Sequence, residues 1–168
     1  MIDNTMTAAR RRRKRNWPRA LLLALGIAVA ARPLVAATTE YVVVDRHSGL
    51  AISGFDPVLY FADGAAMPGR AAFEHPFAGA VWRFRNEGNR AAFAAEPDIY
   101  MPRFGGYDPI GVTRGIAAPG NPRLWVVSEG RLYLFYTEQA RIAFKEDAEA
   151  IAAEADRNWP SVQLTLSP

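Results

Sequence analysis

Few side chains in this chain of 168 residues are suited to chemistry, and none of them is a cysteine. Two aspartates stand directly before prolines, in Asp56-Pro57 and Asp108-Pro109, and the only histidines are His47 and His75. The absence of cysteine excludes a thiolate metal site, a disulfide framework and a cysteine nucleophile. Carboxylates and imidazoles would instead suit a harder divalent cation or a mixed histidine and carboxylate site.

Two interpretations of Asp108 compete. As a ligand, it would hold a divalent metal ion or a small molecule, joined in space by His75. As a helix N-cap, it would bond the first turn of a helix that Pro109 begins, since proline has no N–H to lose there. We favour the cap, and more strongly still for Asp56, where Asp56→Ala is expected to cost ~1 kcal/mol. The two roles are compatible, because a capping carboxylate can present its second oxygen outward.

The histidines lack the spacing of a helical metal pair. His47 lies in a polar segment, and His75 precedes a proline between two phenylalanines. Neither has a histidine partner four residues away. Isolated histidines are more often surface or hydrogen-bonded residues than ligands, so His75 enters the candidate metal site only together with Asp108.

A glycine-rich turn leads into Asp108. In Phe104-Gly105-Gly106-Tyr107 the two glycines allow a close backbone approach, and Tyr107 beside Asp108 is a candidate lip for a small ligand. A turn that is simply packed by its two aromatic side chains is the favoured alternative.

Motifs for catalysis are lacking. The sequence has no Gly-x-Ser-x-Gly elbow, no phosphate-binding glycine loop and no dinucleotide fingerprint. Asp56 and Asp108 offer an acid and base pair in principle, but most folded proteins contain such pairs. We therefore predict a protein that is not an enzyme, and an unrecognised hydrolase or oxidoreductase is the weakest hypothesis.

Short strands and helices must position these residues. In the first half of the chain, a β-branched run predicts a strand over 41–44. Alternating apolar and basic residues predict a second strand over 80–85. A helix capped by Asn86 is expected to run to about Ala95, with Phe93 inward.

The second half predicts a hairpin and a long helix. The hairpin strands are expected over 124–127 and 132–136, around a tight turn at Glu129-Gly130. Thr137 is expected to cap one C-terminal helix. Its apolar stripe consists of Ala140, Phe144, Ala148, Ile151 and Ala155. We recognise no internal repeat in residues 38–168 and predict one small α+β domain with an antiparallel sheet.

The first 37 residues have the order of a secretory signal peptide. A basic run at 10–15 precedes an apolar stretch at 20–31 and small residues ending at Ala37. A retained membrane anchor is one alternative, but the apolar stretch spans only ~18 Å of a ~30 Å hydrocarbon core. A nucleic-acid-binding tail is another, against which the apolar block argues. We predict a periplasmic or secreted protein with no stable membrane span after cleavage.

Charge is divided unequally along the chain. Residues 1–37 hold eight of the twenty Lys and Arg residues, whereas residues 38–168 hold sixteen acids against twelve bases, a net charge of −4. An acidic domain is a poor match for a polyanion. We therefore predict no nucleic-acid partner.

Several stretches of the sequence are similar to exported YHS-domain proteins. The similar stretches, in order, are Gly54–Phe61 (family pattern near GYDPVAYF), Ala80–Phe84, Asn89–Phe93, Glu96–Tyr107 (near DPxxYAPQYGGY), Gly130–Leu134 and Ala155–Pro160. They cover nearly all of residues 50–160, within a domain expected over 38–168. The resemblance implies a small α+β module that is proposed to bind metal, and it implies no known reaction.

The chain departs from this family at one position. After Gly-Gly-Tyr the family usually has cysteine, where this sequence has Asp108. A carboxylate prefers harder cations than a thiolate does, so the metal preference changes or the site is lost. We predict an exported, non-catalytic YHS-type module that holds a metal ion or small ligand near Asp108, Tyr107 and His75. The alternative is a degenerate member that acts through a protein partner.

Overall fold

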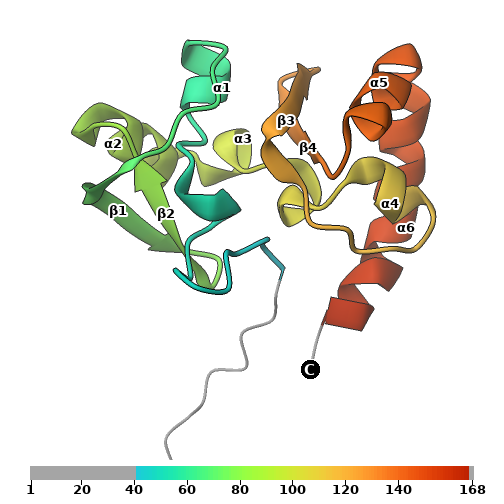
Figure 1. The fold of residues 1–168 in the computed structure, drawn as a ribbon, viewed down its shortest axis with the longest axis horizontal. Helices are drawn as coiled ribbons and strands as arrows, with labels where there is room; N and C mark the ends of the chain where they lie inside the picture. The colour runs from blue at the N-terminus through green and yellow to red at the C-terminus, as the bar shows by residue number, and fades with distance from the viewer. Residues whose placement is uncertain (1–40, 167–168) are drawn as a thin grey trace, which may run out of the picture. The chain divides into compact units, whose positions relative to one another are not determined.

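The order of elements occurs twice in residues 41–166, which are the residues that the computed structural model describes (Figure 1). These residues all belong to one unit of the chain, 36–168. The expected signal peptide, residues 1–37, lies outside the described residues.

Each repeat consists of a tight turn, a short helix, a hairpin and a longer helix. The first repeat, residues 51–100, contains η1 (Ile52–Gly54), α1 (Leu59–Ala62), β1 (Arg70–Phe77), β2 (Ala80–Phe84), α2 (Glu87–Ala95) and α3 (Pro97–Tyr100). The second repeat, residues 103–151, contains η2 (Arg103–Gly106), α4 (Pro109–Thr113), β3 (Asn121–Ser128), β4 (Arg131–Phe135), α5 (Glu138–Glu146) and the start of α6 (Ala148–Leu166). Equivalent residues are 51 or 52 positions apart in the sequence.

The two hairpins agree in detail. Both are antiparallel, and each has an irregularity in register, between Arg70 and Glu74 in one and between Asn121 and Trp125 in the other. Both turn through two residues with positive φ, the second a glycine. Such backbone angles belong to tight hairpin turns and suit glycine.

The repeat corrects our expectation that the sequence contains none. Identical residues recur only at scattered positions, mostly where the backbone or the core allows little choice. The identical pairs include Gly54 and Gly106, Asp56 and Asp108, Pro57 and Pro109, Pro68 and Pro119, Gly69 and Gly120, Gly79 and Gly130, Phe84 and Phe135, Arg90 and Arg141, and Phe93 and Phe144. The shared fold therefore rests on caps, turns and core positions rather than on continuous similarity.

The predicted fold class is confirmed, because helices accompany two small antiparallel sheets and a long helix ends the domain. The expected hairpin is β3 with β4, and Asn86 and Thr137 cap α2 and α5 as predicted. The strand expected over 41–44 is wrong, because Val44 makes only an isolated bridge. Strand β1 was not predicted, because its residues lack alternation and include a proline.

The expected single C-terminal helix is two helices. Asp147 ends α5 with an extended φ of −150° and ψ of 65°. Its carboxylate accepts a hydrogen bond from the backbone N–H of Ala150 at 3.3 Å, so the residue that ends one helix also caps the next. Glu96 has nearly the same backbone angles at the equivalent place between α2 and α3.

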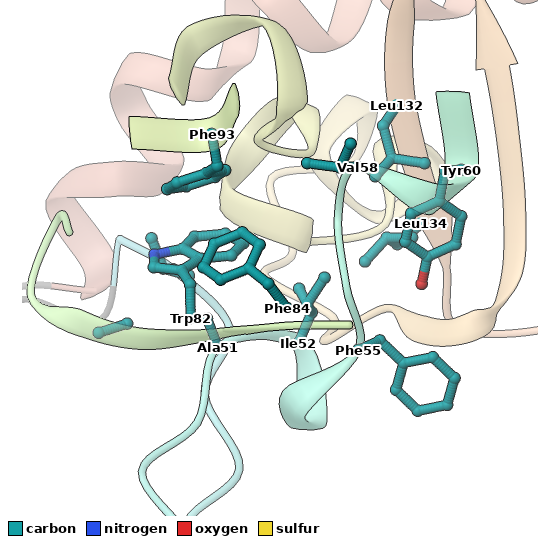
Figure 2. Packing of buried hydrophobic residues seen from close by; sticks show 12 residues of the cluster. Ala51, Ile52, Phe55, Val58, Tyr60, Trp82, Phe84, Phe93, Leu132 and Leu134 are labelled. Atoms are coloured by element: carbon teal, nitrogen blue, oxygen red, sulfur yellow. The ribbon is translucent and has the colours of Figure 1, made fainter. Parts of the chain in front are cut away.

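Two hydrophobic cores hold the repeats together. The first contains Trp82, Phe84 and Phe93 of the first repeat together with Leu132 and Leu134 of β4. Figure 2 shows these two leucines on the side of the core where Tyr60 lies. The second core contains residues of η2, α4, β4 and α5, closed by Ala155 and Val162 of α6. The second repeat thus completes the core of the first repeat, and α6 completes the core of the second.

Among the described residues, no helix combines the length and the apolar character needed to cross a membrane.

Candidate functional site: the pocket beside Asp108

Asp56 and Asp108 occupy the same position in the two repeats and are the buried acidic side chains of the described chain, 0% and 3% exposed. Each follows a glycine turn and stands before a proline that begins a helical turn. The backbone N–H of Asp56 donates to Met67 and that of Asp108 to Ala118, both at 2.9 Å. The same local backbone structure therefore occurs in both repeats and places a carboxylate in the protein interior in each.

Each carboxylate bonds a local N–H with one oxygen and a distant N–H with the other. Oδ1 of Asp56 accepts from the N–H of Val58 at 2.9 Å, and Oδ1 of Asp108 accepts from Ile110 at 2.8 Å. The predicted capping role is confirmed for Asp108, which is the N-cap of α4. For Asp56 it is wrong, because α1 begins later, with Val58 as its N-cap, and the carboxylate instead bonds the turn that precedes the helix. Oδ2 reaches across to the residue that follows the hairpin, and it accepts from the N–H of Arg85 at 2.6 Å or of Tyr136 at 2.8 Å.

The two carboxylates differ in one hydrogen bond. Oδ2 of Asp56 also accepts from the side-chain amide of Asn89 at 2.7 Å. In the second repeat the position of Asn89 is taken by Ala140, whose methyl group has nothing to donate. A carboxylate oxygen can accept two hydrogen bonds, so Oδ2 of Asp108 keeps one acceptor position that no described residue uses.

A pocket of about 450 Å³ lies on this side of Asp108, and Ala140 is part of its wall. Its apolar wall is formed by Ile110, Ile116, Ala140 and Ala143, from α4, α5 and the loop after α4. A volume of this size is typical of sites for small organic ligands. The pocket therefore borders the position where the second repeat has an alanine in place of the asparagine that binds Asp56.

The rim of the pocket carries exposed side chains. Tyr136 is 62% exposed and Ile116 is 56% exposed, although both are large and apolar in part. The lining holds two charged side chains, buried Asp108 and exposed Arg114, and Gln139 and Thr137 add polar atoms. The pocket can therefore offer an acceptor, a cation and an apolar wall to one ligand.

Tyr107 does not form the expected lip. It is 4% exposed, packs in the second core with its ring centroid 6.0 Å from that of Trp159, and is not part of the pocket lining. Its turn runs inward because Gly105 lets the backbone of Tyr41 approach so closely that a Cβ would meet its carbonyl oxygen. Phe104 is buried with it, so the aromatic turn is a packing element, as the favoured alternative predicted.

The structure does not bring His75 to Asp108. His75 lies on β1, and its ring centroid is 6.2 Å from that of Phe93 in the first repeat. The pocket beside Asp108 does not include it. His47 lies in an exposed turn where its N–H donates to Asp45 at 3.1 Å, and hydrogen bonds from Ser48 lower the pKa of that aspartate. Within residues 41–166, no three His, Cys, Asp or Glu side chains gather as metal ligands would.

The residues that shape the pocket were not predicted from the sequence. Arg114, Tyr136 and Ala140 belong to no motif that is associated with ligand binding. They become apparent when the two repeats are compared. The first repeat has Asp63, Arg85 and Asn89 at the equivalent positions, in that order. The pocket thus depends on substitutions between two copies of one unit.

Comparison of this chain with models of protein families, with curated proteins and with solved structures found no match. The resemblance to YHS-domain proteins accordingly stays a prediction from the sequence.

Proposed function

We propose that this chain is an exported, non-catalytic binding module of YHS type that holds a small organic ligand in the pocket beside Asp108. The observation that carries the proposal is the acceptor position on Oδ2 of Asp108, which Asn89 fills for Asp56 and which no described residue fills in the second repeat, where Asp108 and Ala140 both line the pocket. A second acceptor position on a carboxylate oxygen that lines a pocket can bind an N–H or O–H donor of a ligand.

The geometry favours an organic ligand over a metal ion at Asp108. Both carboxylate oxygens already accept backbone N–H groups, and these donors would have to be given up or shared if a cation bound in their place. The pocket wall is mostly apolar, whereas hard divalent cations prefer several oxygen ligands.

Isopentylamine provides a simple test, because it combines a protonated amine with a branched apolar body. In ¹H–¹⁵N NMR spectra of the protein, we expect the largest shift changes at the N–H of Tyr136, which shares Oδ2 of Asp108, and at Ala140. Ala140→Asn should abolish these changes, because its amide would occupy the acceptor as Asn89 does for Asp56. The same substitution at exposed Ala94 on α2 is the matched control and should leave binding intact. Shift changes that are absent or spread over the surface would rule out the site.

A protein-interaction module is the second candidate function, and the exposed Tyr136 and Ile116 favour it. Large exposed apolar side chains beside a pocket are common where proteins bind one another. A photo-crosslinking residue in place of Tyr136 should then give one discrete product of higher mass in cells. The same residue in place of Ile99, which is exposed elsewhere, should give none.

A further inference from the structure

We propose that the ligand of the pocket beside Asp108 is an amino acid with an apolar side chain, bound through its ammonium group to Asp108 and through its carboxylate to Arg114. This inference rests on the proposed binding function and adds the chemical class of the ligand.

The ammonium group is assigned to Asp108. In the first repeat the Asn89 amide fills the second acceptor position on Oδ2 of Asp56, and in the second repeat no described residue fills this position on Asp108. A ligand group that binds there must therefore be an N–H or O–H donor. Asp108 is buried and lies within the pocket lining. A cationic donor is the best match, because hydrogen bonds between charged groups are shorter and stronger than those between neutral ones.

The carboxylate is assigned to Arg114. Arg114 follows α4 directly and contributes to the pocket lining. Within residues 41–166, no ion pair or side-chain hydrogen bond engages its guanidinium group. The first repeat has Asp63 after α1 at the same place, so the charge is reversed in the repeat where the pocket is open. Arginine is well suited to binding a carboxylate through two parallel hydrogen bonds.

The apolar side chain is assigned to the wall formed by Ile110, Ile116, Ala140 and Ala143. The volume of about 450 Å³ has room for an amino acid with a branched aliphatic side chain. Asp108 and Arg114 are the charged groups of the lining, one of each sign. A ligand with a single charge would leave the other group unmatched, whereas a zwitterion matches both.

Three ligands of one carbon skeleton test this assignment by titration calorimetry on the purified full chain. Leucine has both charged groups, isopentylamine lacks the carboxylate, and 4-methylpentanoate lacks the amine. We expect leucine to bind about tenfold more tightly than isopentylamine, since it adds a charge-assisted contact, and 4-methylpentanoate not to bind measurably.

Arg114→Gln should lower the affinity for leucine about tenfold, to that of isopentylamine, and leave the affinity for isopentylamine unchanged. Arg46→Gln removes the same charge from an exposed loop outside the pocket and is the matched control, with no effect on either ligand. Ala140→Asn should abolish the binding of both.

Two results would overturn the assignment while leaving the binding function in place. Either leucine binds no more tightly than isopentylamine, or Arg114→Gln weakens both ligands equally. If neither ligand binds to the unaltered protein, or if Ala140→Asn leaves both affinities unchanged, the proposed binding function falls and this inference falls with it.

Discussion

The first repeat closes over its buried carboxylate, whereas the second repeat leaves its carboxylate beside a pocket. Asp56 accepts three hydrogen bonds, the third from Asn89, and Asp108 accepts two. The backbone around the two aspartates is alike, including the turn before and the hairpin after. The comparison shows that a few side chains decide whether the same backbone arrangement is closed around its carboxylate or leaves a pocket beside it.

The two repeats also differ in what covers their cores. Leu132 and Leu134 of the second repeat complete the first core, so both faces of β4 are buried. On β2, the residues equivalent to these leucines are Val81 and Arg83, which are half-buried, and Arg83 pairs with Glu74 at 2.6 Å. The cores of the two repeats are therefore completed differently. Residues of the second repeat complete the first core, and residues of α6 complete the second.

Removal of the carboxylates is expected to have the largest effect on stability and to separate the repeats. Asp56→Ala should lower the free energy of unfolding by about 3 kcal/mol and Asp108→Ala by about 2 kcal/mol, because buried donors lose their acceptor. The estimate for Asp56 exceeds that of a cap alone, since the N–H of Arg85 and the amide of Asn89 are stranded too. Urea denaturation measures both values, and exposed Asp63→Ala serves as a control with little change. Equal losses at the two aspartates would mean that the third hydrogen bond contributes nothing.

A methyl group added at Gly69 or Gly120 should destabilise both repeats to the same degree. An added Cβ would lie 2.5 Å from the backbone carbon of Arg83 in the first case and 2.6 Å from the carbonyl oxygen of Gly106 in the second. We expect Gly69→Ala and Gly120→Ala each to cost about 2 kcal/mol through overpacking, measured by thermal and urea unfolding. A large difference between them would show that the shared frame is not equally tight.

Exchange of Asn89 and Ala140 should convert each repeat toward the other. Asn89→Ala removes a hydrogen bond to a buried carboxylate and is expected to cost about 1.5 kcal/mol. Ala140→Asn adds the equivalent bond and should raise stability by up to about 1 kcal/mol, offset in part by the lower helix propensity of asparagine. The two changes, followed by urea denaturation, should have opposite signs. If both destabilise, the space beside Asp108 does not accept an asparagine, and the equivalence of the two positions is wrong.

Tyr60 is expected to give the smallest effect, and one that depends on pH. Its hydroxyl donates to the carbonyl of Pro122 at 2.8 Å, and the equivalent residue, Val112, makes no such bond. Burial raises the pKa of the Tyr60 phenol, so the unfolded state loses this proton first as the pH rises. The contribution of Tyr60 to stability is therefore complete below about pH 10, the pKa of a free tyrosine, and is lost as the pH rises through the folded-state pKa.

Tyr60→Phe should cost about 1 kcal/mol at neutral pH and make the decline above pH 10 shallower. Unfolding in urea at a series of pH values up to 11 checks both expectations. Exposed Tyr41→Phe is the control and should leave the pH profile as it is. An unchanged slope in Tyr60→Phe would contradict the link between its burial and alkaline instability.

Much of the local structure could be predicted because its causes lie within a few residues. The caps at Asn86 and Thr137, the helical turns after Asp56 and Asp108 and the hairpin at Glu129-Gly130 all depend on neighbours in sequence. Predictions from local sequence were wrong where long-range contacts determine the backbone hydrogen bonds. The segment 41–44 has the composition of a strand, yet the N–H of Val43 donates to Gly105, its carbonyl accepts from Ile52, and Val44 makes only an isolated bridge.

The sequence by itself determined that the chain turns at Glu129-Gly130 and that Asn86, Asp108 and Thr137 cap helices. Only the tertiary structure decided what meets the second oxygen of that carboxylate. Its partner at Tyr136 lies 28 residues away, and the group that completes Asp56 lies 33 residues away. A helix cap needs one carboxylate oxygen and an N–H nearby in the sequence, so it can be predicted from spacing. The other oxygen bonds a group from a distant part of the chain, and local composition and spacing do not specify which group that is.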